Sequence, residues 1–203
     1  IADGEPQDWL NGREVRHLAL DRNHDNFGNT PRAVGAMLAV GEGYDAIAFL
    51  DADNWIDLDH LEHCLEVAAA GGEVDYVLAQ RRLLTPGGKE LVMPEDGDIF
   101  KGDTNCLLYL RGAFHLLSLW GTMPRMASLI GDRVIYRAMK VGKLLEGSAW
   151  RPTVNYVTRY AGAYLLAGEE PPEAARYVDF DGVISWLTSL DGRERKVTER
   201  LMR

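Results

Sequence analysis

The chain has 203 residues, of which 46% are hydrophobic and 26% charged, a composition typical of one soluble globular domain. A chain of this length can bury a sizeable core without disulfides or a structural metal. Its two cysteines are not spaced as zinc ligands or as a disulfide framework. The formal charge of −9 disfavours a protein that binds nucleic acid by neutralising phosphates.

We find neither a membrane-spanning segment nor an export signal in the amino-acid sequence. No apolar run approaches the roughly 18 residues of a membrane span, and the stretch that begins with Ile1 has no export signal. We therefore expect no transmembrane segment and a cytoplasmic location. Residues 193–203 hold five basic and two acidic side chains. They indicate a solvated helix end or, alternatively, a contact with a membrane surface or a partner.

The first half alternates apolar runs of strand length with helical patterns, as parallel βαβ units do. The expected strands are residues 1–3, 17–20, 45–50 and 74–79. A helix is expected over 30–43, with Val34, Met37 and Leu38 at helical spacing. A second helix is expected after Asp57, with an apolar face of Leu58, Leu61, Leu65 and Ala68. This order predicts an α/β fold with a mostly parallel sheet.

The second half is less regular. It predicts strands over 105–110 and 153–158 and an amphipathic helix over 130–141. No internal repeat or long linker divides the chain, so we expect a single domain over 1–203.

Two carboxylates follow the apolar strand at 45–50, in the segment Asp51-Ala52-Asp53. Open α/β sheets bind ligands beyond the carboxyl ends of their strands. If the backbone stays extended, strand alternation puts both carboxylates on one side, where they suit Mg²⁺ or Mn²⁺. The alternative is a turn, in which aspartate is common.

The motifs around this segment follow a familiar order: Gly28-Asn29, then Pro31-Arg32-Ala33-Val34-Gly35, a small-residue helix, a strand and Asp51-Ala52-Asp53. This order resembles the nucleotide-binding half of family 2 glycosyltransferases with the GT-A fold, and Ala2-Asp3-Gly4 looks like the turn after that fold's second strand. The resemblance is strongest over residues 1–66 and looser to 164. It implies that the first strand of that fold is missing before Ile1.

The resemblance implies a GT-A fold with a mostly parallel central sheet flanked by helices. Residues 1–82 would form the nucleotide-binding half, 83–165 the acceptor and catalytic half, and 166–203 a C-terminal helical tail. The implied activity is transfer of a sugar from a UDP- or GDP-sugar to a hydroxyl acceptor, either a saccharide, a lipid or a small molecule. Inversion at the anomeric carbon and dependence on Mn²⁺ or Mg²⁺ are implied as well.

Site residues follow from the resemblance by position. Asp3 and Arg32 match residues near the nucleotide, and Asp51 and Asp53 match the pair that binds the metal and the sugar nucleotide. Asp132, in Gly131-Asp132-Arg133, matches the catalytic base; an ordinary helix cap is its competing interpretation.

Further hypotheses stay open from the sequence. Asp103 is a second candidate for the base or for a sugar contact, or else a turn residue, and Trp120 is expected to pack in the core. A sugar nucleotidyltransferase and a non-catalytic nucleotide-sugar-binding domain are alternative functions. A homo-oligomer is compatible with each of them.

Overall fold

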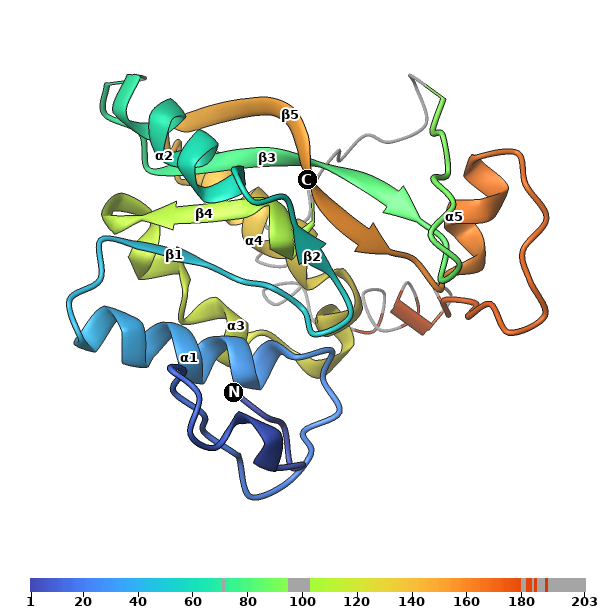
Figure 1. Ribbon diagram of the computed structural model, residues 1–203, viewed down its shortest axis with the longest axis horizontal. Helices are drawn as coiled ribbons and strands as arrows, with labels where there is room; N and C mark the ends of the chain where they lie inside the picture. Colours follow the sequence, from blue (N-terminus) through green and yellow to red (C-terminus); the bar gives the residue numbers. More distant parts are fainter. Residues whose placement is uncertain (71, 95–102, 180–181, 184, 186–188, 190–203) are drawn as a thin grey trace.

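The computed structural model describes residues 1–70, 72–94, 103–179, 182–183, 185 and 189 (Figure 1). Its centre is a five-stranded sheet with the strand order β1-β4-β3-β5-β2. The strands are β1 (Ala46–Ala48), β2 (Trp55–Ile56), β3 (Tyr76–Leu84), β4 (Leu107–Leu110) and β5 (Glu146–Val157). The sheet is thus built from three short strands around two long ones.

The expectation of a mostly parallel GT-A sheet is wrong. Among the described strands, β3 and β5 form the one parallel pair, while β1–β4, β4–β3 and β5–β2 are antiparallel. A parallel pair needs a crossover connection, and the helical segment between β4 and β5 supplies one for β3 and β5. The alternation of strands and helices along the sequence does not determine the direction in which neighbouring strands run. The sheet has both parallel and antiparallel pairs, and the fold is mixed α/β.

Helices flank this sheet and carry several of the residues discussed below. They are α1 (Asn29–Gly41), α2 (His60–Ala70), α3 (Leu119–Thr122), α4 (Gly131–Val141) and α5 (Ala161–Leu166), with 3₁₀ turns at Asp8–Leu10, Thr104–Cys106, Arg111–Leu116 and Arg125–Ile130. Helices α1 and α3 lie together beside β1, and α5 lies beyond the ends of β3 and β5 (Figure 1). The helices expected at 30–43 and 130–141 are confirmed as α1 and α4.

Strand lengths differ from the expectation. The strands expected at 74–79 and 153–158 extend to Tyr76–Leu84 and Glu146–Val157. Residues 1–3 and 17–20 form only an isolated parallel bridge, between Ala2 and Ala19. Two short hydrogen-bonded segments therefore stand where two full strands were expected.

Strand β5 contains more residues than the part of β3 that it faces. Ala79 pairs with Ala149, Gln80 with Pro152 and Arg81 with Val154, so Trp150, Arg151 and Thr153 have no partner on β3. Extra residues of this kind bend a strand, and Pro152 removes a ladder donor at the same place. The curve of β5 in Figure 1 follows from this excursion.

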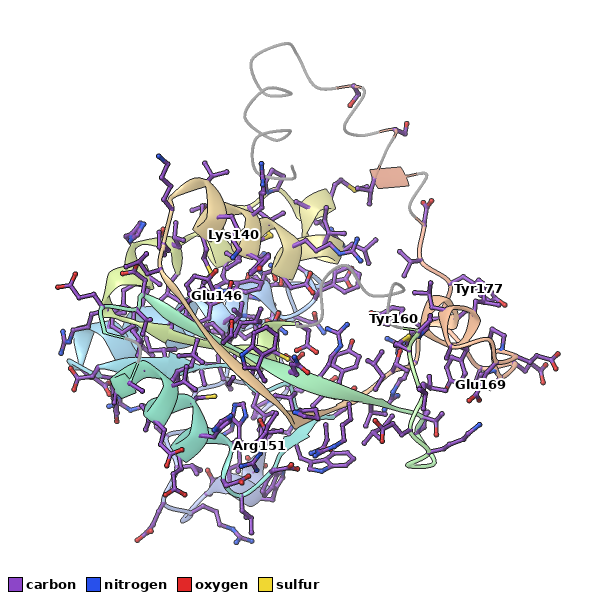
Figure 2. The ribbon with its side chains drawn as sticks, turned by 90° about the horizontal axis from the view of Figure 1, so that it is seen from above. Lys140, Glu146, Arg151, Tyr160, Glu169 and Tyr177 are labelled. Atoms are coloured by element: carbon purple, nitrogen blue, oxygen red, sulfur yellow. The ribbon has the colours of Figure 1, made fainter. Side chains whose placement is uncertain are left out.

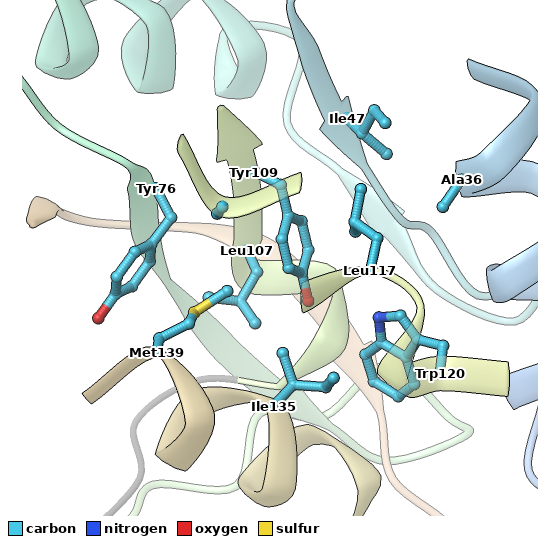
Figure 3. Close-up of a cluster of buried hydrophobic side chains, with 10 residues drawn as sticks. Ala36, Ile47, Tyr76, Leu107, Tyr109, Leu117, Trp120, Ile135 and Met139 are labelled. Carbon is cyan, nitrogen blue, oxygen red and sulfur yellow. The ribbon is translucent and has the colours of Figure 1, made fainter. Parts of the chain in front are cut away.

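The main core lies between β3, β4 and α4 (Figure 3). It holds fully buried aromatic and aliphatic side chains from four elements: Tyr76, Tyr109, Leu107, Trp120, Ile135 and Met139. A second core on the other face holds Cys64, Val77, Ala79, Cys106, Leu108, Ala149 and Val154. Burial on both faces explains the apolar run of residues 76–79 in β3 and that of 107–110 in β4. Trp120 is a core residue, as expected.

Polar contacts fix α4 against β5. The Glu146 carboxylate accepts hydrogen bonds from Tyr76 Oη and Lys140 Nζ, each at 2.7 Å. Lys140 and Glu146 lie close together in Figure 2. This anchoring holds the helix that carries Asp132.

Helix α2 does not bury the apolar face expected from the sequence. Leu58, Leu61 and Leu65 are 108%, 47% and 50% exposed, whereas His60 and Cys64 are buried. The buried imidazole is hydrogen-bonded through Nδ1 to Thr153 Oγ1 at 2.7 Å, which offsets the cost of removing it from water. Of the expected face only Ala68 packs against the second core, so the expectation is wrong for the three leucines.

No helix in the described part of the chain is both long and apolar enough to cross a membrane. The basic segment 193–203 and most of the tail expected beyond residue 180 lie outside the described residues. The single-domain organisation over 1–203, and its division at 82 and 165, stay predictions.

Candidate functional site

A cavity of about 560 Å³ opens where the first turns of α1 and α4 meet β3, the start of the β4 segment and α5. Its lining includes Arg32, Asp51, Asp103 and Asp132, four of the six site residues expected from the sequence. These side chains come from four separate elements of the chain. The cleft is therefore the candidate functional site.

Arg32 lies in the first turn of α1 and faces the cleft. Its Nη1 donates to the Phe27 carbonyl at 2.7 Å, and its Nη2 forms an ion pair with Asp51 Oδ1. The guanidinium carbon lies 5.2 Å from the centroid of the Trp120 ring, within range of a cation–π contact. Three different partners thus hold one cation in place, with only 13% of its side chain exposed.

Gly28 makes this placement of Arg32 possible. It precedes α1 with φ of +80°, a left-handed conformation that favours glycine. A Cβ at this position would lie 3.3 Å from Arg32 Nη1. The Gly-Asn sequence before the helix therefore has a local structural reason.

Asp51 and Asp53 do not continue the strand. The backbone N–H of Asn54 donates to the backbone carbonyl of Asp51 at 3.0 Å, which closes a turn over residues 51–54. Asp51 then faces Arg32 and Asn105, whose amide Nδ2 lies 3.3 Å from Asp51 Oδ2. Asp53 is half exposed, its Oδ2 lies 3.9 Å from Arg159 Nε, and it does not line the cleft. The extended arrangement that would have aligned the two carboxylates is replaced by the turn.

The turn bears directly on the predicted cation site. In the parts of the chain that the structure describes, no three His, Cys, Asp or Glu side chains form a cluster able to hold a metal ion. Mg²⁺ is often held by one or two carboxylates together with substrate phosphates and water, so a pair of aspartates can suffice. Here a cation would compete with Arg32 for Asp51. The Asp51–Asp53 site for Mn²⁺ or Mg²⁺ stays a prediction.

Asp103 is buried at the start of the segment that leads into β4. Its Oδ1 accepts from the Asn105 backbone N at 2.6 Å and from Asn105 Nδ2 at 2.9 Å, and its Oδ2 lies 3.4 Å from Arg81 Nη1. Burial raises the pKa of Asp103, and the carboxylate of Asp132 adds to the rise, while Arg81 and Asn105 oppose it. The turn interpretation and the site interpretation of Asp103 are thus both compatible with its position.

Asp132 lies in the first turn of α4 and lines the cleft, where it is half-buried. Its Oδ1 accepts from the Arg133 backbone N at 2.7 Å. Burial of the carboxyl group raises the pKa of Asp132, and the hydrogen bond from the Arg133 backbone and the charges of Arg133, Arg81 and Arg32 oppose the rise. An aspartate with a raised pKa in a cleft is a candidate proton acceptor.

Asp3 lies away from the cleft. Its Oδ1 lies 2.6 Å from His24 Nδ1, and its Oδ2 accepts from the His24 backbone N at 3.0 Å. These bonds hold the loop that leads to Phe27 and α1. Asp3 therefore supports the site at a distance, and its predicted contact with the nucleotide stays a prediction.

Sequence reasoning missed two residues of the site, Arg81 and Asn29. Arg81 interrupts the apolar strand β3, approaches Asp103, and lies 5.7 Å from the ring centroid of Tyr156. Two successive arginines inside a strand that is otherwise buried were the available signal. Asn29 lines the cleft from the first position of α1 although only 1% of it is exposed.

Comparison with known protein families finds no family model that matches the chain, and comparison with curated proteins finds no match. The functional argument therefore rests on the residues of the cleft.

Proposed function

We propose that this chain is an enzyme that transfers a sugar from a nucleotide-diphosphate sugar, a UDP- or GDP-sugar, to a hydroxyl acceptor with inversion at the anomeric carbon. One observation carries the proposal. Two carboxyl groups with raised pKa, Asp103 and Asp132, line the same cavity as two guanidinium groups, Arg32 and Arg81. The reaction needs this combination of a base and a binding site for a diphosphate.

Asp132 is the proposed base. A raised pKa makes its carboxylate a stronger proton acceptor than an exposed aspartate. It takes the proton of the acceptor hydroxyl while that oxygen bonds to the anomeric carbon. The bond from this carbon to the diphosphate breaks, and its electron pair leaves with the diphosphate. Attack from the face opposite the leaving group inverts the anomeric centre.

The arginines would bind the leaving diphosphate. Guanidinium groups donate two parallel hydrogen bonds to phosphate oxygens, and Arg32 and Arg81 are both held in fixed positions. A Mn²⁺ or Mg²⁺ ion at Asp51 and Asp53 is part of the proposal and would neutralise further charge on the diphosphate. For the acidic residues of this chain to bind it, Asp51 must exchange its contact with Arg32 for the cation.

The outer wall of the cleft supports an acceptor with an apolar part. It is formed by Leu165 and Leu166 of α5, which are 61% and 55% exposed, and by Tyr177. Tyr160 and Tyr177 lie near each other beside α5 (Figure 2). The proposal includes a cytoplasmic location, in line with two buried free cysteines.

The proposal is tested by incubating the protein with UDP- and GDP-sugars and measuring release of UDP or GDP, with and without Mn²⁺. The wild type is expected to release nucleotide, and Asp53→Ala to need more Mn²⁺ for half-maximal rate. Equal Mn²⁺ dependence in the two proteins would remove the cation from the proposal. Tight binding of a nucleotide sugar without turnover on any acceptor would favour a non-catalytic binding domain, and release of pyrophosphate from a nucleoside triphosphate and a sugar phosphate would favour a nucleotidyltransferase.

A further inference from the structure

Asn29 carries an unused carboxamide at the floor of the cleft. The residue is 1% exposed and lines the cavity, yet neither Oδ1 nor Nδ2 has a hydrogen-bond partner among the residues that the structure describes. A buried polar side chain normally has such a partner, because removing it from water without one costs free energy. A group of this kind in a cleft is expected to find its partner in a ligand.

The amide of Asn29 packs beside Gly131. A Cβ on Gly131 would lie 3.3 Å from Asn29 Oδ1 and 3.1 Å from the Trp120 ring, so a glycine at this position leaves room for the amide. The neighbouring helical position on the same face of α1 is Arg32, three residues on. Asp132 directly follows Gly131. The unpaired amide therefore lies beside the residue that precedes the proposed base, and one helical turn from the proposed diphosphate ligand.

The chemistry of the amide limits what it can bind. A carboxamide offers two N–H donors and one acceptor oxygen. A diphosphate offers acceptors only and would leave Oδ1 unpaired. Two adjacent sugar hydroxyls each donate and accept, so they satisfy both ends of the amide together.

We propose that Asn29 binds hydroxyl groups of the transferred sugar and so selects the donor by its sugar rather than by its nucleotide. This inference rests on the proposed function and deepens it. The amide, placed beside Gly131, positions the sugar ring next to Asp132 while Arg32 binds the diphosphate. An alanine at position 29 removes the sugar contact and leaves the phosphate contacts in place.

The first experiment tests whether Asn29 is free in the absence of ligand. Asn29→Ala is compared with Asn54→Ala, because Asn54 Oδ1 accepts from the Val157 backbone N at 2.9 Å. The midpoint of thermal unfolding is expected to fall for Asn54→Ala and to stay level or rise for Asn29→Ala, since alanine also favours the helix. A fall for Asn29→Ala as large as that for Asn54→Ala would show a structural partner and overturn the inference.

The second experiment measures binding by calorimetry, with UDP, UDP-glucose, UDP-galactose, UDP-N-acetylglucosamine and GDP-mannose as probes. The wild type is expected to bind one nucleotide sugar more tightly than the free nucleotide, and Asn29→Ala to lose about tenfold in affinity for that sugar nucleotide with unchanged affinity for UDP or GDP. An equal loss for the free nucleotide would assign Asn29 to the nucleotide and overturn the inference. If the wild type releases nucleotide and Asn29→Ala changes neither binding nor rate, the inference is overturned and the proposed function stands. If the wild type binds no probe, the proposed function is overturned.

Discussion

Arg81 and Arg82 are consecutive residues of β3 that serve two different regions. Each meets an aspartate, and each aspartate meets an asparagine: Arg81 with Asp103 and Asn105 in the cleft, Arg82 with Asp57 and Asn155 elsewhere. Successive side chains of a strand point to opposite faces of the sheet, which accounts for the separation. The same three residue types thus form two clusters.

The two clusters affect their aspartates in opposite directions. Arg82 Nη1 lies 3.0 and 3.3 Å from the two oxygens of Asp57, and Asn155 Nδ2 donates to Asp57 at 2.8 Å. The hydrogen bond from Asn155, together with that from Arg82 and its charge, lowers the pKa of Asp57. In the cleft, burial raises the pKa of Asp103 despite Arg81 at 3.4 Å.

The comparison separates a structural ion pair from a site suited to chemistry. Close contacts and partial exposure keep Asp57 ionised, so its cluster supports the fold. A looser contact with Arg81 and deeper burial accompany the raised pKa of Asp103, and the pKa of its neighbour Asp132 is raised as well. Four predictions test this difference.

The largest effect is expected from Asp132→Asn. Loss of the general base should lower the rate of sugar transfer by about 10²- to 10⁴-fold without a comparable change in the unfolding midpoint. Nucleotide release under saturating donor measures it. Asp57→Asn, the matched change in the structural cluster, is expected to keep wild-type turnover; an equal loss in both variants would contradict the division into two clusters.

Replacement of the two arginines should separate binding from stability. Arg81→Met removes a cation from the proposed diphosphate site, and we expect kcat/KM to fall by about 10²-fold. Arg82→Met leaves Asp57 without its cation and should lower stability while turnover is retained. Steady-state kinetics and urea unfolding of both variants provide the measurement, and inactivation by Arg82→Met at unchanged stability would speak against it.

Asp57→Asn is expected to lower the free energy of unfolding by about 1 kcal/mol at neutral pH, or about 2–4 °C in the unfolding midpoint. The reason is the loss of a carboxylate that binds Arg82 and Asn155. Asp45→Asn is a suitable control because Asp45 is 87% exposed in its ion pair with Arg111. If Asp45→Asn lowered the free energy of unfolding as much as Asp57→Asn does, Asp57 would have no special role in stability.

The pH dependence should differ in sign between the clusters. The pKa of Asp57 is lowered from 3.8, so its contribution to stability is present above pH 3.8 and lost as the pH falls through the folded-state pKa. The deficit of Asp57→Asn should therefore shrink in acid. The pKa of Asp103 is raised from 3.8, so the stability of Asp103→Asn relative to the wild type should increase as the pH rises from below 3.8. Unfolding free energies from pH 3 to 7 test this, and parallel curves would refute it.

Local motifs predicted much of the cleft. The resemblance to family 2 glycosyltransferases, carried by these motifs, points to Arg32, Asp51, Asp103 and Asp132, and all four line one cavity. The sequence leaves open whether the Asp53 side chain points the same way as that of Asp51. The backbone at Asp51 donates to Asn105 Oδ1, and Asn105 is 54 positions further along the chain.

The fold was predicted less completely for a related reason. Periodicity located α1 and α4, but strand direction depends on which distant strand becomes a neighbour. The buried side of α2 includes His60, whose hydrogen-bond partner Thr153 is 93 positions away in the sequence. Arg81 was missed because a pattern of apolar residues does not reveal which face of β3 meets a cleft.

The number of residues of β5 that have no partner on β3 affects the site. Trp150, Arg151 and Thr153 have no counterpart on β3, and beyond them Asn155 meets Arg82 while Tyr156 meets Arg81. Because side chains alternate, a chain shortened by both Trp150 and Arg151 would keep Asn155 and Tyr156 on their present faces. If the pairing beyond the excursion keeps regular alternation, we expect a chain shortened by one of them to exchange the two side chains. Whether the number of inserted residues is odd or even thus decides which arginine receives the ring.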